Sequence, residues 1–535
     1  MHRVAVVPLE NLTADPALNW IGRAVSAIVA AQVGADKRVQ VFEAAEFASA
    51  QSRLATRTLS AMIVGTVGRF EVRGTLRDEL AHQTIEQWNH SGTDVLELAA
   101  AAARTIGLSP KPYTTSNRDA IKAYFNAVES GDREAALRRA STIDPGYGAP
   151  LVALAEHYLS SGRVPEVPAL LEASDRARLT DLEKARISFV RAQLTGDARD
   201  RLKALSSLVD LQPGDIQLAR GLVEASMNAG DFRLALGACD TLLQLDPESE
   251  VALNSAGYAH TFLGDLPAAR AAFDRYRQRT PKSANAIDSY AEALFYHRQY
   301  AEAAPLFLEA HKMNAAQLNG MEPVRAAISY FLAGNRTEAD RVFAAWAEER
   351  KAKADPHADL RRALWKRWTT GQAGSVSGPV GQAMASLWAL QDGDRNRAMA
   401  LAREARAQAS GGPGAALVGV SALLSQPSAP TEVWEKRIVS ALSDPRAVRA
   451  RAALLGWALL LDGKPADAAK VLQQVYNSTP ALHNNEERIL LAAALRASGD
   501  MSRVRQVMPH GFFPPQSIDP GLTALLFPLA FSLGR

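Results

Sequence analysis

The sequence predicts a mostly α-helical protein: a solenoid of stacked helical hairpins that follows a small amino-terminal α/β domain. Two observations predict the solenoid. Helix-breaking glycines recur at steps of 34 residues, at Gly162, Gly196, Gly230 and Gly264. Prolines follow three of these glycines by 17 residues, at Pro213, Pro247 and Pro281. A third observation predicts the first domain, because apolar residues there switch between strand and helix spacing.

The α/β domain is predicted over residues 1–110. An apolar run at residues 4–9 predicts a strand, and residues 16–33 have helical spacing, with Ile21, Val25 and Ile28 on one face. Further elements are expected in chain order: strands at 39–42 and 61–67, a hairpin through 70–76, a strand near 84–88 and a helix at 93–106. Strands that alternate with helices indicate an α/β layer domain.

The same region carries a resemblance to a known family. Residues 7–16, Val-Pro-Leu-Glu-Asn-Leu-Thr-Ala-Asp-Pro, resemble the opening of a bacterial domain related to the amino-terminal domain of TolB. Residues 63–67 and Trp88 are similar to its later strand signatures, whereas Leu9 and Ala14 stand where that family usually has phenylalanine and glycine. The resemblance covers about residues 1–108. It implies an α/β fold of the kind that precedes helical repeat arrays in signalling proteins, and no catalytic residue.

Each 34-residue unit is predicted to be a helical hairpin. A glycine permits the tight corner between two antiparallel helices, and a proline ends the second helix. With the glycine as position 15, position 20 is alanine in five units: Ala235, Ala269, Ala303, Ala339 and Ala468. Position 24 is larger in the same units: Cys239, Phe273, Phe307, Phe343 and Leu472. We expect the small column to allow close helix approach and the larger one to fill the space between hairpins.

These columns resemble the tetratricopeptide repeat family, which has alanine near position 20, a bulky apolar residue near 24 and proline at 32. Residues 250–283 match best, through Leu253, Gly257, Gly264, Ala269, Phe273 and Pro281. Two units depart from the pattern, because Arg201 replaces the alanine and Arg298 replaces the corner glycine. The resemblance implies a superhelix of hairpins.

The array is assigned to residues 117–355, with six consecutive units over about residues 148–353 and a partial unit near Gly131 and Pro145. Weaker helical repeats and glycine-rich loops follow over residues 356–425. Repeat-like hairpins resume over residues 426–535. The apolar tail at 512–533 is predicted to cap the last hairpin, because solenoids need covered ends.

Composition argues against several classes of protein. Sixty basic against 57 acidic residues give a net charge of +3, too balanced for nucleic acid or an anionic membrane as the main partner. Cys239 is the sole cysteine, which excludes internal disulfides and thiolate zinc sites. No apolar run is long enough to predict membrane insertion. An apolar strand follows Met1 closely, so we expect a cytoplasmic protein, or a periplasmic one if a leader has been removed.

The sequence predicts no enzyme and offers no catalytic, cofactor-binding or metal-binding residue. No two histidines have metal-ligand spacing on a helix, hairpin turns explain Gly65 and Gly68 better than a phosphate loop does, and Cys239 lies in a core column. A basic-aromatic cluster could bind single-stranded nucleic acid, although an amphipathic helix is the favoured interpretation. Its residues are Arg361, Arg362, Trp365, Lys366, Arg367 and Trp368.

The tetratricopeptide resemblance implies that the first helix of each hairpin lines a concave groove. The candidate groove residues are Arg186, Arg220, Glu224, Asn254, Tyr258, Asp288, Glu292 and Tyr296. Hydrogen-bonding and aromatic side chains of this kind suit extended peptides or helices. We therefore predict a scaffold or adaptor that binds a protein or peptide partner. The alternative is a signalling accessory protein whose α/β domain senses a small ligand.

Overall fold

The computed structural model describes residues 2–13, 15–33, 39–43, 55–66, 69–92, 94–110, 112–127, 132–316, 320–355, 357–411, 414–444, 447–478 and 486–508, with 510, 512, 514, 526 and 529. The chain separates into two compact units, residues 1–255 and 256–535. Each unit is described by itself.

The first unit begins with a mixed β-sheet. Its strands are β1 (His2–Val6), β2 (Glu10–Asn11), β3 (Val39–Glu43), β4 (Arg57–Thr66), β5 (Arg69–Asp78) and β6 (Gln83–Ser91). The strand order is β3-β1-β4-β5-β6, with β2 also paired to β4. The β1, β2 and β3 pairings are parallel, whereas β4, β5 and β6 form an antiparallel meander. This sheet, with two helices, is the predicted small α/β domain.

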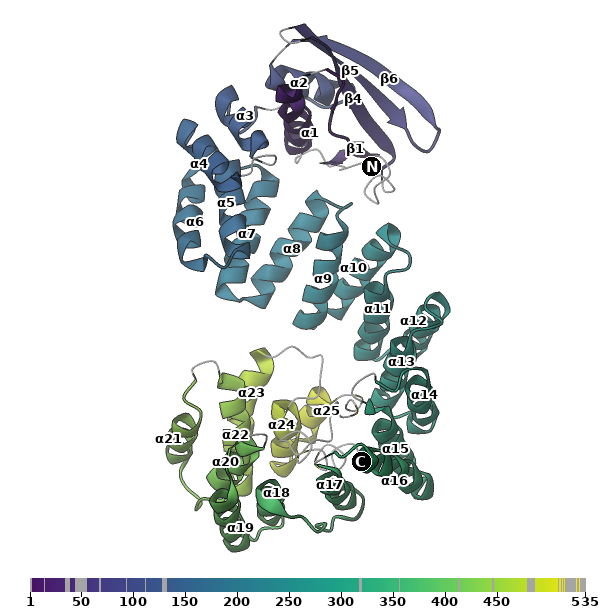
Figure 1. Cartoon of the computed structure of the whole chain (residues 1–535), viewed down its shortest axis with the longest axis vertical. Helices are drawn as coiled ribbons and strands as arrows, with labels where there is room; N and C mark the ends of the chain where they lie inside the picture. The colour runs from purple at the N-terminus through teal and green to yellow at the C-terminus, as the bar shows by residue number, and fades with distance from the viewer. Residues whose placement is uncertain are drawn as a thin grey trace. The chain divides into compact units, whose positions relative to one another are not determined.

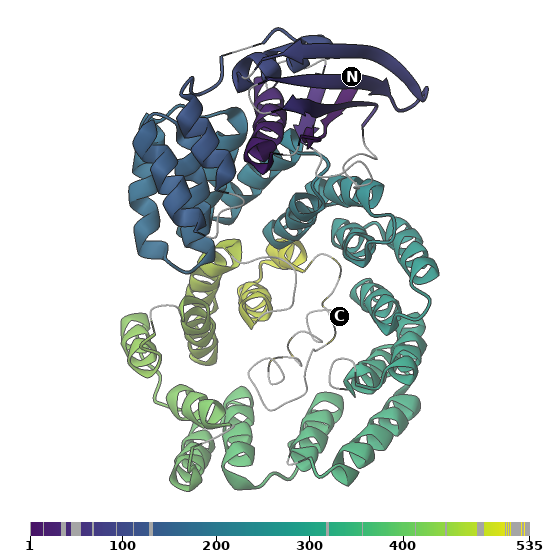
Figure 2. The ribbon, with the colours of Figure 1, turned by 45° about the horizontal axis from the view of Figure 1, so that its top comes forward.

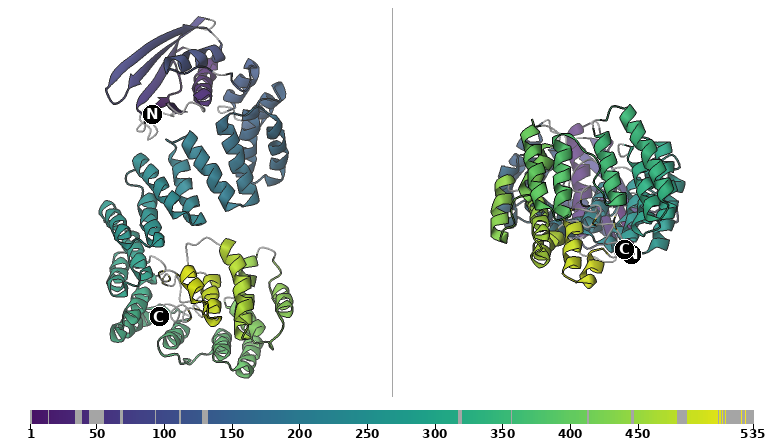
Figure 3. Two further views of the ribbon diagram at one scale, coloured as in Figure 1. Left: turned by 180° about the vertical axis from the view of Figure 1, so that it is seen from behind. Right: turned by 90° about the horizontal axis from the view of Figure 1, so that it is seen from below.

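Helices cover one face of this sheet. Figures 1 and 3 show α1 (Asn19–Val33) and α2 (Val95–Thr105) on the same side. Val25 and Ile28 of α1 are buried in one core with Ile63 and Val72 of the sheet. The alternation of strand side chains places the neighbouring Met62 on the opposite, exposed face.

Trp88 lies across the strand pair from Gly74. A side chain at Gly74 would meet the Trp88 indole at 2.0 Å, so the glycine leaves the space that this ring fills. This contact accounts for a tryptophan that the sequence flagged only through a family resemblance.

The rest of the first unit consists of helical hairpins, which Figure 1 shows as antiparallel pairs side by side. Their helices are α3 (Arg118–Asn126), α4 (Arg133–Ile143), α5 (Gly148–Ser160), α6 (Val167–Arg176), α7 (Asp181–Thr195), α8 (Ala198–Leu211), α9 (Ile216–Ala229) and α10 (Phe232–Leu245). The next helix, α11 (Glu250–Leu263), begins in this unit.

Local chemistry at the corners explains why these hairpins form. Gly196 and Gly230 have φ of 71° and 73°, a backbone conformation that glycine adopts without a steric penalty. The residue after each is an aspartate whose carboxylate accepts backbone N–H groups at the start of the next helix: Asp197 and Asp231. The same Gly-Asp pair recurs at Gly264, Gly393 and Gly499. One glycine thus ends a helix while the following residue starts the next.

The second unit continues the hairpins. Its helices are α12 (Leu266–Arg279), α13 (Ala284–Tyr296), α14 (Tyr300–Met313), α15 (Glu322–Leu332), α16 (Arg336–Ala352), α17 (Ala358–Thr370), α18 (Gly378–Gln391), α19 (Arg395–Gln408), α20 (Ala415–Leu424), α21 (Thr431–Ala441), α22 (Val448–Leu461), α23 (Pro465–Ser478), α24 (Glu486–Ala497) and α25 (Met501–Val507). Figure 2 shows α13 to α16 side by side in chain order.

The two predicted core columns are buried. The position-20 alanines are all 0% exposed: Ala235, Ala269, Ala303, Ala339 and Ala468. At position 24, Phe273, Phe307 and Leu472 are 0% exposed, and Cys239 and Phe343 are nearly so. The prediction of a mostly α, tetratricopeptide-like solenoid behind a small α/β domain is confirmed.

In each of two hairpins, one glycine allows the two helices to approach closely. A Cβ at Gly257 would meet the Phe273 ring at 2.5 Å, and a Cβ at Gly456 would meet Leu472 at 2.6 Å. Both contacts join position 8 of a first helix to position 24 of a second helix. The same contact therefore recurs in hairpins far apart in the sequence.

Some predicted features lie outside the described residues. These are Thr93, the first residue of the helix predicted at 93–106, with Gly68, Gly131 and most of the predicted tail cap at 512–533.

Candidate protein-binding face

In the first unit, Arg186 on α7 is already engaged within the protein. Its Nε donates to Oε1 of Glu156 at 2.7 Å, and its Nη2 contacts the other carboxylate oxygen. The side chain is about 29% exposed, so this pair is only partly screened by water. Arg186 therefore forms part of the surface that the first helices of the hairpins present, which we call the first-helix face.

Arg220 on α9 and Asn254 on α11 occupy the equivalent position in the next two 34-residue repeats. Each carries a buried polar atom without a hydrogen-bond partner in the described structure, namely Nε of Arg220 and Oδ1 of Asn254. Glu224, one turn beyond Arg220 on α9, is exposed. Buried polar atoms are almost always paired in folded proteins, so these two atoms have hydrogen-bonding capacity that the described residues do not use.

In the second unit, three of the four remaining candidate residues form a buried polar cluster around Arg325 of α15. Arg325 Nη1 lies 3.1 and 3.0 Å from the two oxygens of Asp288, and 2.9 Å from Oε1 of Glu292. The hydroxyl of Tyr258 donates to Oε2 of Glu292. Asp288, Glu292 and Arg325 are 3%, 6% and 0% exposed. The structure thus brings Tyr258, Asp288 and Glu292 together, but as an internal network.

No feature of the repeat pattern pointed to Arg325. Gly334 follows the preceding corner residue, Arg298, by 36 residues instead of 34. With Gly334 as position 15, Arg325 is position 6 of its repeat, whereas Asp288 and Glu292 are positions 5 and 9 of theirs.

Electrostatics in this cluster are set by burial. Burial raises the pKa of Asp288, and the neighbouring Glu292 and Glu322 add to this effect, while Arg325 opposes it. Burial also raises the pKa of Glu322, which is 0% exposed and lies 3.5 Å from Nδ1 of His311. One guanidinium therefore contacts two of these buried carboxyl groups, Asp288 and Glu292.

Tyr296, at the end of α13, is 2% exposed and lies among other rings. Its ring centroid is 5.8 Å from that of Phe262 and 5.8 Å from that of His510. His510 belongs to the carboxy-terminal segment, so this candidate residue contacts another part of its own chain.

The basic-aromatic cluster is an amphipathic helix, as favoured from the sequence. Trp365 of α17 stacks on Phe343 at a centroid distance of 4.5 Å, and both tryptophans of the cluster are 7% exposed. Arg361 pairs with Asp355, and Arg367 Nη2 lies 2.6 Å from Asp392. Because these cations pair with carboxylates of the same protein, the cluster is explained by packing.

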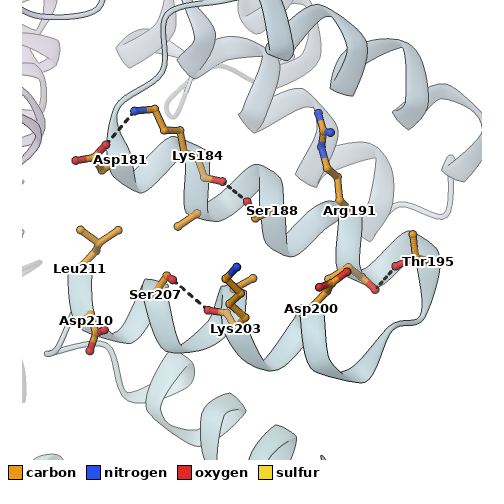
Figure 4. Close-up of a pocket in the computed structure, with 13 residues that line it drawn as sticks. Asp181, Lys184, Ser188, Arg191, Thr195, Asp200, Lys203, Ser207, Asp210 and Leu211 are labelled. Atoms are coloured by element: carbon orange, nitrogen blue, oxygen red, sulfur yellow. Dashed lines mark hydrogen bonds and ion pairs between the residues drawn. The ribbon is translucent and has the colours of Figure 1, made fainter. Parts of the chain in front are cut away.

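A groove between α7 and α8 has a cavity volume of about 770 Å³. Figure 4 shows side chains of both charge signs along it, including the ion pair of Asp181 and Lys184 at 3.0 Å. This mixed lining selects no single ligand charge.

Among the described residues, no three His, Cys, Asp or Glu side chains gather as metal ligands would. None of the described helices is both long and apolar enough to cross a bilayer.

No family model matches this sequence, and no curated protein matches it. Solved structures of helical repeat proteins are similar in part. The MamA protein is 17% identical, with 33% of this chain and 95% of that chain covered and a TM-score of 0.29. A tetratricopeptide repeat protein from Parabacteroides merdae is 17% identical, with 57% and 97% covered and a TM-score of 0.28.

The Naa15/Naa10 complex bound to HypK-THB is 12% identical, with 73% of this chain and 68% of that chain covered and a TM-score of 0.35. The assignment to a tetratricopeptide-like solenoid therefore rests on the hairpin geometry of this chain and not on these scores.

Proposed function

We propose that this protein is a non-catalytic scaffold that binds a protein or peptide partner along the first helices of its hairpins. The best-supported part of this face lies on α9 and on the beginning of α11, both in the first unit. A helical repeat array suits this role because successive hairpins present equivalent side chains at regular intervals.

The observation that carries the proposal is the pair of unpartnered atoms at Arg220 and Asn254. Nε of Arg220 is a donor and Oδ1 of Asn254 is an acceptor. An extended peptide offers carbonyl acceptors and N–H donors along its backbone, so it complements both atoms regardless of its side chains. The exposed Glu224 next to them adds a charge that would favour a basic residue in the partner.

Affinity purification followed by mass spectrometry tests this face directly. The full chain is compared with an Arg220→Ala/Asn254→Ala variant, and with Arg233→Ala as the matched control. Arg233 is an exposed arginine on the second helix, α10, of the same hairpin. We expect the wild type and the control to recover the same partners and the double variant to lose them, at unchanged helicity.

Equal recovery by all three proteins would reject the first-helix face. No observation on the described residues favours the alternative, small-ligand sensing by the α/β domain.

A further inference from the structure

The segment after α25 lies against hairpin corners more than 200 residues earlier in the chain. Nε of Arg298 donates a hydrogen bond to the backbone carbonyl of His510, 2.7 Å away across 212 residues. The His510 ring lies 5.1 Å from that of His297. All of these residues belong to the second unit.

Phe512 provides the apolar half of this contact. It is 1% exposed, and its ring meets that of Phe295 edge-on at 5.6 Å. Phe295 is near the end of α13, three residues before Arg298. One short stretch of the hairpin therefore contacts both His510 and Phe512.

Arg298 is an unexpected residue at a corner. Its φ is 61°, in the left-handed region where the neighbouring corners have Gly264 and Gly334. Its backbone N–H bonds to Phe295 O at 2.9 Å, just as that of Gly264 bonds to Thr261 O at 3.1 Å. Glycine would make the same corner without strain, so the backbone does not explain the arginine. The hydrogen bond from its guanidinium to His510 explains why an arginine occupies this corner.

The preceding corner residue, Gly264, leaves space for the ring of His510. A Cβ at Gly264 would meet the His510 imidazole at 2.6 Å, so a side chain there would collide with the ring. Two consecutive corners, Gly264 and Arg298, thus accommodate one imidazole, and Phe295 beside them accommodates one phenyl ring. We call these three residues with Tyr296 and His297 the corner seat.

The contacts described for His510 and Phe512 do not require these residues to be part of the same chain. Neither His510 nor Phe512 lies in a helix or strand. The contacts are one backbone carbonyl, one imidazole and one phenyl ring, all of which a short extended peptide carries. Arg298 is exposed and His297 is half-buried, so a competitor could reach the seat from solvent.

We propose that the corner seat is a second peptide-binding site, selective for histidine followed two residues later by phenylalanine, and that residues 508–514 are its intramolecular ligand. A partner with a His-x-Phe segment displaces this ligand. The site is separate from the first-helix face and does not depend on it.

A labelled peptide of residues 508–514, Met-Pro-His-Gly-Phe-Phe-Pro, tests the proposal by fluorescence anisotropy with the full chain. In the wild type, the tethered segment competes with the peptide at a high effective concentration. A Phe512→Ala chain has lost the phenyl contact of this competitor and keeps only the contacts of His510. We expect it to bind the peptide about tenfold more tightly than the wild type, as expected for removal of a tethered ligand.

Two further variants in the Phe512→Ala background locate the site. Arg298→Gly removes the hydrogen bond to His510 while relieving the backbone, so we expect peptide affinity to fall with no loss of helicity. Arg275→Ala removes an exposed arginine of α12 and should leave affinity unchanged. Should Phe512→Ala fail to fold, His510→Ala replaces it.

Three results would overturn the proposal. The first is no binding of the 508–514 peptide to the Phe512→Ala chain, and the second is equal binding of the peptide to this chain and the wild type. The third result is equal peptide affinity of the Phe512→Ala chain with and without Arg298→Gly. Arg220 and Asn254 are unchanged throughout, so failure here would not bear on the first-helix face.

Discussion

Arg325 and Asp288 form a buried ion pair in which one guanidinium nitrogen contacts both carboxylate oxygens, at 3.0 and 3.1 Å. The pair joins α15 to α13, first helices of successive hairpins. Two charges taken out of water are stabilising together only while both are present. The packing of these hairpins therefore depends on a polar contact as well as on the apolar columns.

Replacing Arg325 with alanine should destabilise the second unit strongly. Asp288 and Glu292 would remain buried without their cation, which costs about 3–5 kcal/mol for a broken buried pair. Chemical denaturation followed by circular dichroism measures this change.

Arg362→Ala is the matched control for this prediction, because Arg362 of α17 pairs with Glu348 near the surface, with side chains 34% and 70% exposed. Such an exposed pair is worth about 1 kcal/mol or less. Similar losses for Arg325→Ala and Arg362→Ala would show that the buried network is not a major source of stability.

The corner seat should bind its peptide more weakly in acid. Burial, helped by the charge of Arg298, lowers the pKa of His510, and burial, helped by His510 and Arg270, lowers that of His297. The docked state therefore resists protonation, whereas a released histidine takes up a proton near its ordinary pKa of about 6.5. Docking is strongest above that pH and weakens as the pH falls below it.

The measurement is the dissociation constant of the 508–514 peptide for the Phe512→Ala chain at pH 7.5 and pH 5.5, with several-fold weaker binding expected at pH 5.5. A peptide with His510→Gln should lose part of this dependence. Tighter binding in acid would contradict the predicted sign.

The solenoid could be predicted from sequence because its determinants are local. A corner glycine, its capping aspartate and the position-20 alanine all act within one 34-residue unit, so each unit repeats the same signal. The corners were predicted from the glycines alone, although the Gly-Asp pair, such as Gly230 with Asp231, is also visible in the sequence.

The contacts that distinguish this protein from other arrays could not be predicted. Arg325 meets Asp288 across 37 residues, and Arg298 meets His510 across 212. The first contact depends on how hairpins stack and the second on where the segment after α25 lies, and no local pattern encodes either. The sequence did flag Arg298 as a departure from the repeat, and the structure gives that departure a contact.

The thiol of Cys239 should be unreactive in the native protein. Burial raises its pKa to about 12, with a smaller contribution from Asp240, and only the thiolate reacts with disulfide reagents. With Ellman's reagent at pH 8, we expect a slow native reaction and a rapid stoichiometric one in guanidinium chloride. Cys239→Ala supplies the blank, and a rapid reaction of the native chain would place the thiol outside the core column.

The close approach at position 8 predicts opposite effects for the same substitution at two glycines of the second unit. Gly257→Ala places a Cβ against the Phe273 ring, which is 0% exposed and has no room to withdraw, so a loss of about 1–3 kcal/mol is expected for overpacking. Gly419→Ala, in α20, meets nothing within 4 Å and should add about 0.5–1 kcal/mol through helix propensity. Urea unfolding of both variants beside the wild type measures the difference. Destabilisation by both would indicate a general intolerance of helix substitution, whereas a neutral Gly257→Ala would mean that the hairpin can open around Phe273.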